Sequence, residues 1–119
     1  MRTAGPTSAI KYWIDGSAPN RKLVVQFTDD QFYSGLVGSQ MTAQAILYEG
    51  SNNVEIHTTV VNRSTNTTGG VEGIQNAAGT VAYTVSCRNA TTYSVGAPDP
   101  YRFSPDVIAV SSYSWSPAT

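Results

Sequence analysis

The segment "AILYEGSNNVEI", Ala45–Ile56, carries the strongest fold signal in the chain. Hydrophobic and polar residues alternate on both sides of a short polar stretch that holds Gly50 and two adjacent asparagines. This alternation is typical of half-buried β-strands, and glycine and asparagine accept the left-handed backbone conformation that tight turns require. The segment therefore predicts two neighbouring strands joined as a hairpin, with Glu49 and Glu55 facing solvent near its ends.

The same period of two recurs along the rest of the chain. It is seen in residues 9–15, 22–28 and 80–87, and the two strands of the hairpin extend over residues 40–49 and 53–61. Stretches rich in glycine, proline, asparagine and aspartate separate these segments, and no window shows a helical period. Short strands between such turns predict an all-β fold of the antiparallel β-sandwich class.

The composition narrows the classes of protein to which the chain can belong. It has 119 residues, 40% of them hydrophobic and 13% charged, with a formal net charge of −1. This length suits one domain, and the neutral polar surface is typical of extracellular and virion β-proteins. The two lysines and five arginines are scattered, which argues against nucleic-acid binding. No apolar run approaches the roughly 20 residues of a membrane-spanning helix.

Three motifs together resemble a known module. They are "APNRKLVVQF" at residues 18–27, "ILYEGSNNVEI" at residues 46–56 and "GIQNAAGT" at residues 73–80. With their neighbouring segments, over residues 9–105, they resemble a β-sandwich module repeated in large secreted bacterial proteins, notably surface and gliding-type adhesins. The resemblance implies a jelly-roll-like sandwich with a structural or adhesive role, and it implies no catalysis.

The resemblance also divides the chain into a sandwich domain, residues 1–105, and a C-terminal tail, residues 106–119. The related modules have more strands before residue 9, so this chain resembles their C-terminal part. A sandwich that lacks strands exposes an edge and an apolar face, which is unfavourable for a lone monomer.

The tail "DVIAVSSYSWSPAT" is a candidate for the missing strand. Ile108 and Val110 fall on one side of it, and Tyr113 and Trp115 fall on the other. Apolar groups on both sides indicate burial on both faces, and aromatic side chains are the usual anchors of protein–protein contacts. We expect the tail to pair with a neighbouring copy, as in donor-strand complementation, and pairing within its own chain is the alternative.

Few residues of this chain are suited to catalysis. His57 is the only histidine and lies on the solvent side of its predicted strand. The sequence has no G-x-S-x-G nucleophile elbow that could supply a serine to pair with it. Cys87 is the only cysteine, which excludes an internal disulfide, and it lies on the apolar side of its segment. We expect Cys87 to be buried as a small hydrophobic residue, and we expect no enzymatic activity.

The acidic loop "TDDQFY" is the candidate ligand site. Asp29 and Asp30 are candidate calcium ligands, although aspartate also starts turns, and we favour the turn. Phe32 and Tyr33 are candidates for stacking on a sugar ring. Trp13 is a further aromatic candidate, for which packing in a core or an interface is preferred. One histidine and one cysteine do not make a zinc site.

These expectations combine into a function. We expect a non-enzymatic structural or adhesive subunit of an extracellular fibre, a cell-surface adhesin or a virion surface. Its expected partners are other copies of itself or neighbouring structural subunits. The alternative is a carbohydrate-binding module that recognises glycans, with calcium as the one cofactor considered.

Overall fold

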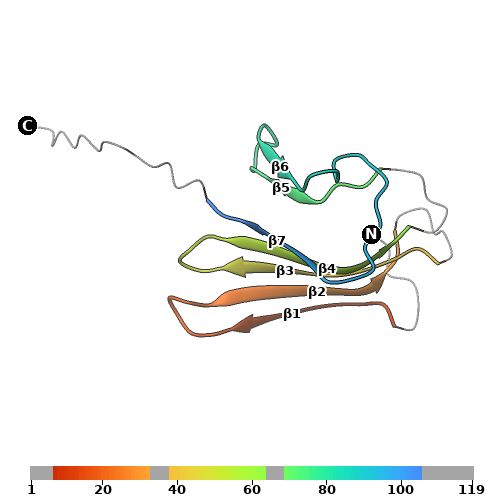
Figure 1. The fold of residues 1–119 in the computed structure, drawn as a ribbon. Helices are drawn as coiled ribbons and strands as arrows, with labels where there is room; N and C mark the ends of the chain where they lie inside the picture. The colour runs from red at the N-terminus through yellow and green to blue at the C-terminus, as the bar shows by residue number, and fades with distance from the viewer. Residues whose placement is uncertain (1–6, 33–37, 64–68, 106–119) are drawn as a thin grey trace, which may run out of the picture.

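The computed structural model describes residues 7–32, 38–63 and 69–105 (Figure 1). Within these residues the chain forms seven β-strands and no helix. The strands are β1 (Ala9–Asp15), β2 (Lys22–Asp30), β3 (Gln40–Tyr48), β4 (Val54–Asn62), β5 (Gly73–Gln75), β6 (Ala82–Thr84) and β7 (Asp99–Phe103). All strand pairings are antiparallel, so the predicted all-β antiparallel class is confirmed.

A five-stranded sheet forms one layer of the molecule, and the β5–β6 hairpin forms part of a second layer (Figure 1). The sheet has the order β1-β2-β3-β4-β7, so four consecutive strands form a meander and β7 returns to lie beside β4. The β5–β6 hairpin lies on the β7 side of the sheet, away from β1 (Figure 1). The described residues thus form a sandwich with one large and one small layer.

The β3–β4 hairpin forms as the sequence predicts. Its turn is closed by a hydrogen bond from the Tyr48 amide N–H to the Asn53 carbonyl oxygen at 3.0 Å. Gly50 and Asn52 have positive φ angles of 80° and 54°. Glycine and asparagine adopt this left-handed conformation at least cost, so these two residues set where the chain reverses.

The register of the strands gives the sheet two chemically different faces. The apolar face carries Ile10, Tyr12, Ile14, Leu23, Val25, Phe27, Ala43, Ala45, Leu47, Val54, Ile56, Tyr101 and Phe103. The opposite face, called here the polar face, carries Lys11, Trp13, Val24, Gln26, Gln44, Ile46, Glu55, His57, Pro100 and Arg102, of which Val24 and Ile46 are buried. Side chains alternate along each strand, so matched pairing of neighbouring strands continues each face across the whole sheet.

Among the described residues, the second layer covers the apolar face over β4 and β7. Val61, Val85 and Val95 are buried, and the backbones of Val61 and Val95 exchange hydrogen bonds of 2.9 and 3.0 Å. The hydroxyl of Thr58, on β4, donates to the carboxylate of Glu72, just before β5, at 3.3 Å. These contacts hold the second layer against β4.

A buried arginine ties the two layers together. The guanidinium of Arg88 donates to the carboxylates of Glu72 and of Asp99, the first residue of β7. The ring centroids of Tyr93 and Tyr101 lie 4.9 and 5.1 Å from the guanidinium carbon. Burial lowers the pKa of Arg88, but the hydrogen bonds to both carboxylates outweigh burial and raise it. Separating these buried charges is costly, so this Arg88 clamp fixes the second layer beside β7.

The prediction that Cys87 is buried in a strand is wrong. The strand β6 ends at Thr84, and the chain then turns, with a hydrogen bond from the Arg88 amide N–H to the Val85 carbonyl oxygen at 3.0 Å. Cys87 lies in this turn with a φ of 61° and is exposed. The alternation that favoured burial no longer applies where the backbone leaves the strand conformation.

Candidate functional site

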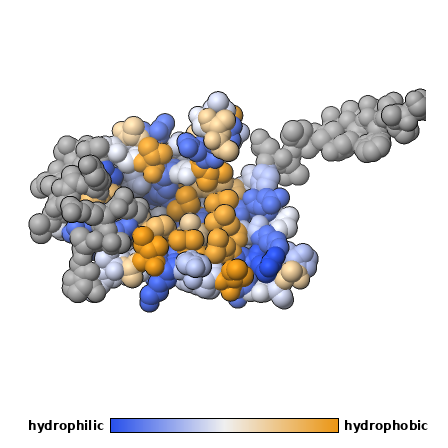
Figure 2. Space-filling view, turned by 180° about the vertical axis from the view of Figure 1, so that it is seen from behind, coloured by the Kyte–Doolittle hydropathy of each residue, from blue (hydrophilic) through white to orange (hydrophobic). Residues whose placement is uncertain are grey.

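The apolar face of β1, β2 and β3 carries large hydrophobic side chains that stay in contact with solvent. The exposed fractions of Ile10, Tyr12 and Ile14 are 50%, 78% and 64%, and Leu23 and Leu47 are also exposed. Hydrophobic residues gather into a patch in the middle of the face seen in Figure 2. The exposure follows from the fold, because the second layer is held over β4 and β7, and β1 is the opposite edge of the sheet.

This face and the adjoining edge strand are suited to binding another molecule. Contiguous apolar patches on a folded domain mark sites of interaction. Among the described strands, β1 pairs with β2 alone. An edge strand presents backbone N–H and C=O groups that can pair with a further strand. The apolar face and the β1 edge therefore form one candidate interaction surface.

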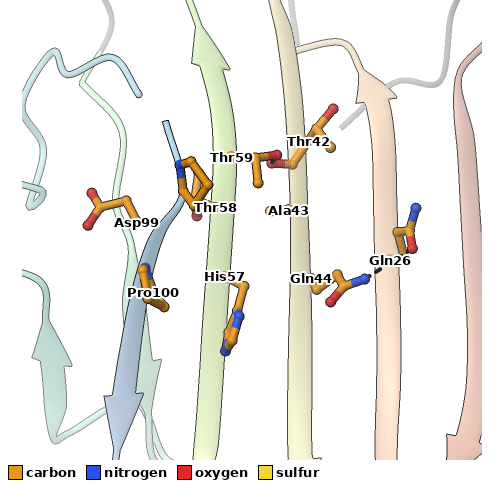
Figure 3. Close-up of a pocket in the computed structure, with 10 residues that line it drawn as sticks. Gln26, Thr42, Ala43, Gln44, His57, Thr58, Thr59, Asp99 and Pro100 are labelled. Carbon is orange, nitrogen blue, oxygen red and sulfur yellow. Dashed lines mark hydrogen bonds between the residues drawn. The ribbon is translucent and has the colours of Figure 1, made fainter. Parts of the chain in front are cut away.

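The polar face carries a shallow groove that crosses the sheet from β2 to β7 (Figure 3). Gln26, Gln44, His57 and Pro100 are successive register partners on β2, β3, β4 and β7. The side-chain amide of Gln44 donates to the carbonyl oxygen of Gln26 at 3.1 Å. These four residues help to line a hollow of about 250 Å³, so the register brings together side chains that are far apart in the sequence.

Glu55 lies on the polar face but is buried, so the prediction that it faces solvent is wrong. Its exposed fraction is 6%, because three neighbouring side chains surround its carboxylate. The hydroxyl of Tyr48 donates to Oε2 at 3.0 Å, and Nε2 of His57 lies 2.8 Å from the same oxygen. The Nε of Arg102 donates to Oε1 at 2.7 Å. One carboxylate therefore orients side chains from β3, β4 and β7.

These hydrogen bonds change the ionisation of the cluster. Burial raises the pKa of Glu55, but hydrogen bonds from His57, Arg102 and Tyr48 outweigh burial and lower the pKa below its ordinary 4.5. Burial and the hydrogen bond to Glu55 raise the pKa of Tyr48. At neutral pH the cluster therefore holds a carboxylate beside the Arg102 cation, with the phenol of Tyr48 protonated.

A second hollow, of about 340 Å³, adjoins the first on the β7 side of the sheet. His57 and Pro100 line both hollows, whereas Glu55, Tyr101 and Arg102 line the second alone. The two hollows therefore form one depression with His57 between them, called here the polar groove.

Sequence reasoning missed the polar groove because its residues come from four strands. The hairpin pairs Gln44 with His57, so the register of that one element already indicates part of it. Arg102 and Pro100 arrive only because β7 lies beside β4, and no local pattern indicates this pairing.

The prediction that Asp29 and Asp30 start a turn is wrong, because both belong to β2, where the register shifts and Asp29 has a φ of 47°. The predicted ligand residues of this segment lie in different surroundings. The Asp29 amide N–H donates to the hydroxyl of Thr42 at 3.2 Å, and Thr42 lines the polar groove. Asp30 has an exposed fraction of 0%, and neither carboxylate oxygen has a hydrogen-bond partner among the described residues. The ring centroid of Phe32 lies 4.9 Å from the guanidinium carbon of Arg63. The structure therefore does not gather these three residues around one outward-facing site.

The other predicted site residues lie outside the described residues. They are Tyr33 of the acidic loop and Ile108, Val110, Tyr113 and Trp115 of the tail. Their predicted roles in ligand binding and assembly stay predictions. Within the described ranges, no three His, Cys, Asp or Glu side chains gather as they would around a metal ion. The described part of the chain also has no helix that is long and apolar enough to cross a membrane.

A comparison with protein-family models identifies the family to which this β-sheet domain is related. A family model described as "NIDO related" matches residues 1–117. The chain belongs to the NIDO-related family. The match spans both layers and continues through residues 106–117, so most of the tail lies within the NIDO-related match. Searches of curated proteins and of solved structures found no match.

Membership of the NIDO-related family bears on where the protein acts. Domains of this family are typically extracellular, which confirms the predicted extracellular setting at the level of the family. The choice between a cell surface and a virion surface stays a prediction. The closer likeness to a bacterial adhesin module also stays a resemblance.

Proposed function

We propose that this chain is a non-enzymatic structural or adhesive module of an extracellular assembly, which associates with neighbouring copies of itself. The observation that carries the proposal is the exposed apolar face of β1, β2 and β3. The described residues leave Ile10, Tyr12 and Ile14 largely exposed, whereas complete burial of one such side chain is worth about 1.5–3 kcal/mol. Membership of a typically extracellular family supports the setting.

The segment proposed to cover this face is residues 106–119 of a neighbouring copy. The strand β7 runs antiparallel to β4, toward the β3–β4 turn, and the described chain ends at Pro105 beyond that end of the sheet (Figure 1). The tail must reverse direction at once to reach its own apolar face, whereas a neighbour's face accepts it without reversal. Extended at about 3.3 Å per residue, the tail reaches roughly 45 Å, more than the width of five strands about 4.8 Å apart.

The side chains of the tail suit this role. In an extended tail Ile108 and Val110 fall on one side, and Val107, Ala109, Tyr113 and Trp115 fall on the other. A donated strand places one side against the apolar face and leaves the other for the next module, so both apolar sides are used. Buried aromatic side chains are frequent anchors of such contacts. We therefore propose Tyr113 and Trp115 as the principal anchors.

Deletion of residues 106–119 tests the proposal. In analytical ultracentrifugation the full chain should form oligomers whose mass rises with concentration, and the deletion variant should sediment as a monomer. A synthetic peptide of residues 106–119 should then bind the deletion variant. Tyr12→Ser should abolish peptide binding, whereas Trp13→Ser, on the opposite face of the same strand, should leave it unchanged.

The outcome that would overturn the proposal is specific. A full chain that stays monomeric at every concentration, and binds a hydrophobic dye only after the deletion, would show that the tail covers its own apolar face. The same result would support the alternative in which the tail completes the sandwich within one chain.

A further inference from the structure

The polar groove lies on the other face of the sheet from the surface proposed for assembly. Its two hollows, of about 250 and 340 Å³, share His57 and Pro100, so the depression runs across β2, β3, β4 and β7. At about 4.8 Å between neighbouring strands, four strands span roughly 15 Å. This length suits a short linear chain of rings better than a single small molecule.

The side chains of the polar groove are planar polar groups held in fixed orientations. The amide of Gln44 donates to Gln26 at 3.1 Å, and the amide of Gln26 donates to the hydroxyl of Thr28 at 3.0 Å. The two carboxylate oxygens of Glu55 hold His57 and Arg102. Side chains that are already ordered lose little conformational entropy when a ligand binds.

These groups keep hydrogen-bonding capacity for a ligand. Among the described residues, the carbonyl oxygen of Gln44 receives no hydrogen bond, and only one N–H of its amide is used, for Gln26. The Nε2 of His57 is engaged by Glu55, which leaves Nδ1 for another partner. Donors and acceptors therefore lie near one another, as recognition of a hydroxyl group requires, since a hydroxyl donates and accepts at once.

The charge of the polar groove favours a neutral ligand. The Glu55 carboxylate is paired with the Arg102 guanidinium at 2.6 Å. The carboxylate of Asp99, which lines the first hollow, is paired with Arg88. A phosphate or sulfate ligand requires surplus positive charge, and an amine requires a free carboxylate. The charged side chains that line the two hollows, Glu55, Asp99 and Arg102, are all paired among the described residues.

Trp13 adds an aromatic surface at the β1 side of the polar groove. Trp13 lies on the polar face opposite Val24, two residues along β1 from Lys11, which is the register partner of Gln26, and its exposed fraction is 41%. An indole ring packs on the apolar face of a sugar ring while the hydroxyls at the ring edge reach polar groups. We infer that the polar groove binds a neutral oligosaccharide, with Trp13 stacking on one of its rings. Gln44 and His57 are its central hydrogen-bond partners.

An NMR titration of the full chain tests the inference. The probes are hexasaccharides of cellulose, xylan, mannan and chitin, all of which are neutral. With at least one probe, the side-chain amide signals of Gln26 and Gln44 and the imidazole signals of His57 should shift and saturate. Trp13→Ser should raise the dissociation constant by about tenfold, the effect of losing one stacking contact.

Matched variants separate binding at the polar groove from other effects. Gln44→Leu should also weaken binding by about tenfold, the effect of losing one hydrogen bond. Tyr12→Ser, on the apolar face of β1, should leave the affinity unchanged. If the spectrum of free Gln44→Leu shows unfolding, Gln44→Ala, which also removes the amide, replaces it with the same expected loss.

Three results would overturn the inference. The first is the absence of saturable shifts with all four probes. The second is an equal loss of affinity in Tyr12→Ser and Trp13→Ser. The third is a set of shifts confined to the acidic loop around Asp29 and Phe32. None of these results bears on assembly through the apolar face, which sedimentation measures separately.

Discussion

The hydroxyl of Tyr48 donates a hydrogen bond of 3.0 Å to the carboxylate of Glu55, across the β3–β4 hairpin. The same carboxylate accepts a hydrogen bond from Arg102 on β7, which is 47 residues further along the chain. One buried side chain thus joins the hairpin to the strand that returns beside it. This position should be among the most sensitive in the sheet.

Glu55→Gln should lower the free energy of unfolding by about 1–3 kcal/mol. The neutral amide accepts weaker hydrogen bonds, and its NH₂ group cannot accept from Tyr48 or Arg102. Urea unfolding followed by tryptophan fluorescence measures the change. Glu49→Gln is the matched control, since it removes an exposed ion pair with Arg21 and should have a much smaller effect. Equal losses in the two variants would contradict the prediction.

Acidification should destabilise the fold through the same carboxylates. The pKa of Glu55 is lowered below 4.5, and hydrogen bonds from Arg21 lower the pKa of Glu49 to about 2. Because Glu49 is exposed, solvent screens its pair with Arg21, so most of the effect comes from Glu55. A carboxyl group with a depressed folded-state pKa stabilises the fold above its unfolded pKa, and this contribution is lost as the pH falls through the folded pKa. The urea midpoint should therefore fall from about pH 5 toward pH 2, and Glu55→Gln should flatten this dependence. A urea midpoint that stays constant between about pH 5 and pH 2 would contradict this prediction.

Arg88→Ala should lower the free energy of unfolding by about 3–5 kcal/mol, because it leaves the carboxylates of Glu72 and Asp99 without their cation. Combining it with Glu72→Gln should cost less than the sum of the two single changes, with a coupling of about 1–3 kcal/mol. A double-mutant cycle by chemical denaturation measures this coupling. Strict additivity would show that the Arg88 clamp does not hold the two layers together.

Gly73→Ala should separate β5 from β6. The added methyl group meets the backbone carbonyl of Tyr83, which cannot move aside without breaking the pairing of the two strands. We expect a loss of about 1–3 kcal/mol and faster amide hydrogen exchange in β6. Gly96→Ala is the matched control, since no atom of the described residues lies within 4 Å of its added methyl group. A similar loss at both glycines would count against the close packing of β5 on β6.

The elements that could be predicted are those with strong local signals. The alternation over residues 9–15 matches β1, and the alternation over residues 22–28 lies within β2. The turn that holds Gly50 and Asn52 has the positive φ angles expected of it. In each case neighbouring residues contain the whole signal, because alternation and turn conformation act over a few positions.

The errors have a common physical origin. Alternation correctly places Glu55 on the outer face of β4, but it cannot show that Tyr48, His57 and Arg102 cover the carboxylate. Alternation also assigns Cys87 to an apolar side, but the chain turns before that residue is reached. Burial depends on what packs against a side chain, and this is a property of the whole fold.

By itself, the sequence determined the main strands, the β3–β4 hairpin and the division of the sheet into an apolar and a polar face. Only the tertiary structure decided which parts of these faces stay open. The Arg88 clamp places the second layer over β4 and β7, and this leaves Tyr12 and Ile14 in solvent. The return of β7 brings Arg102 and Pro100 to the polar groove. Contacts between segments far apart decided both outcomes, because burial and charge pairing depend on tertiary neighbours and have no local period.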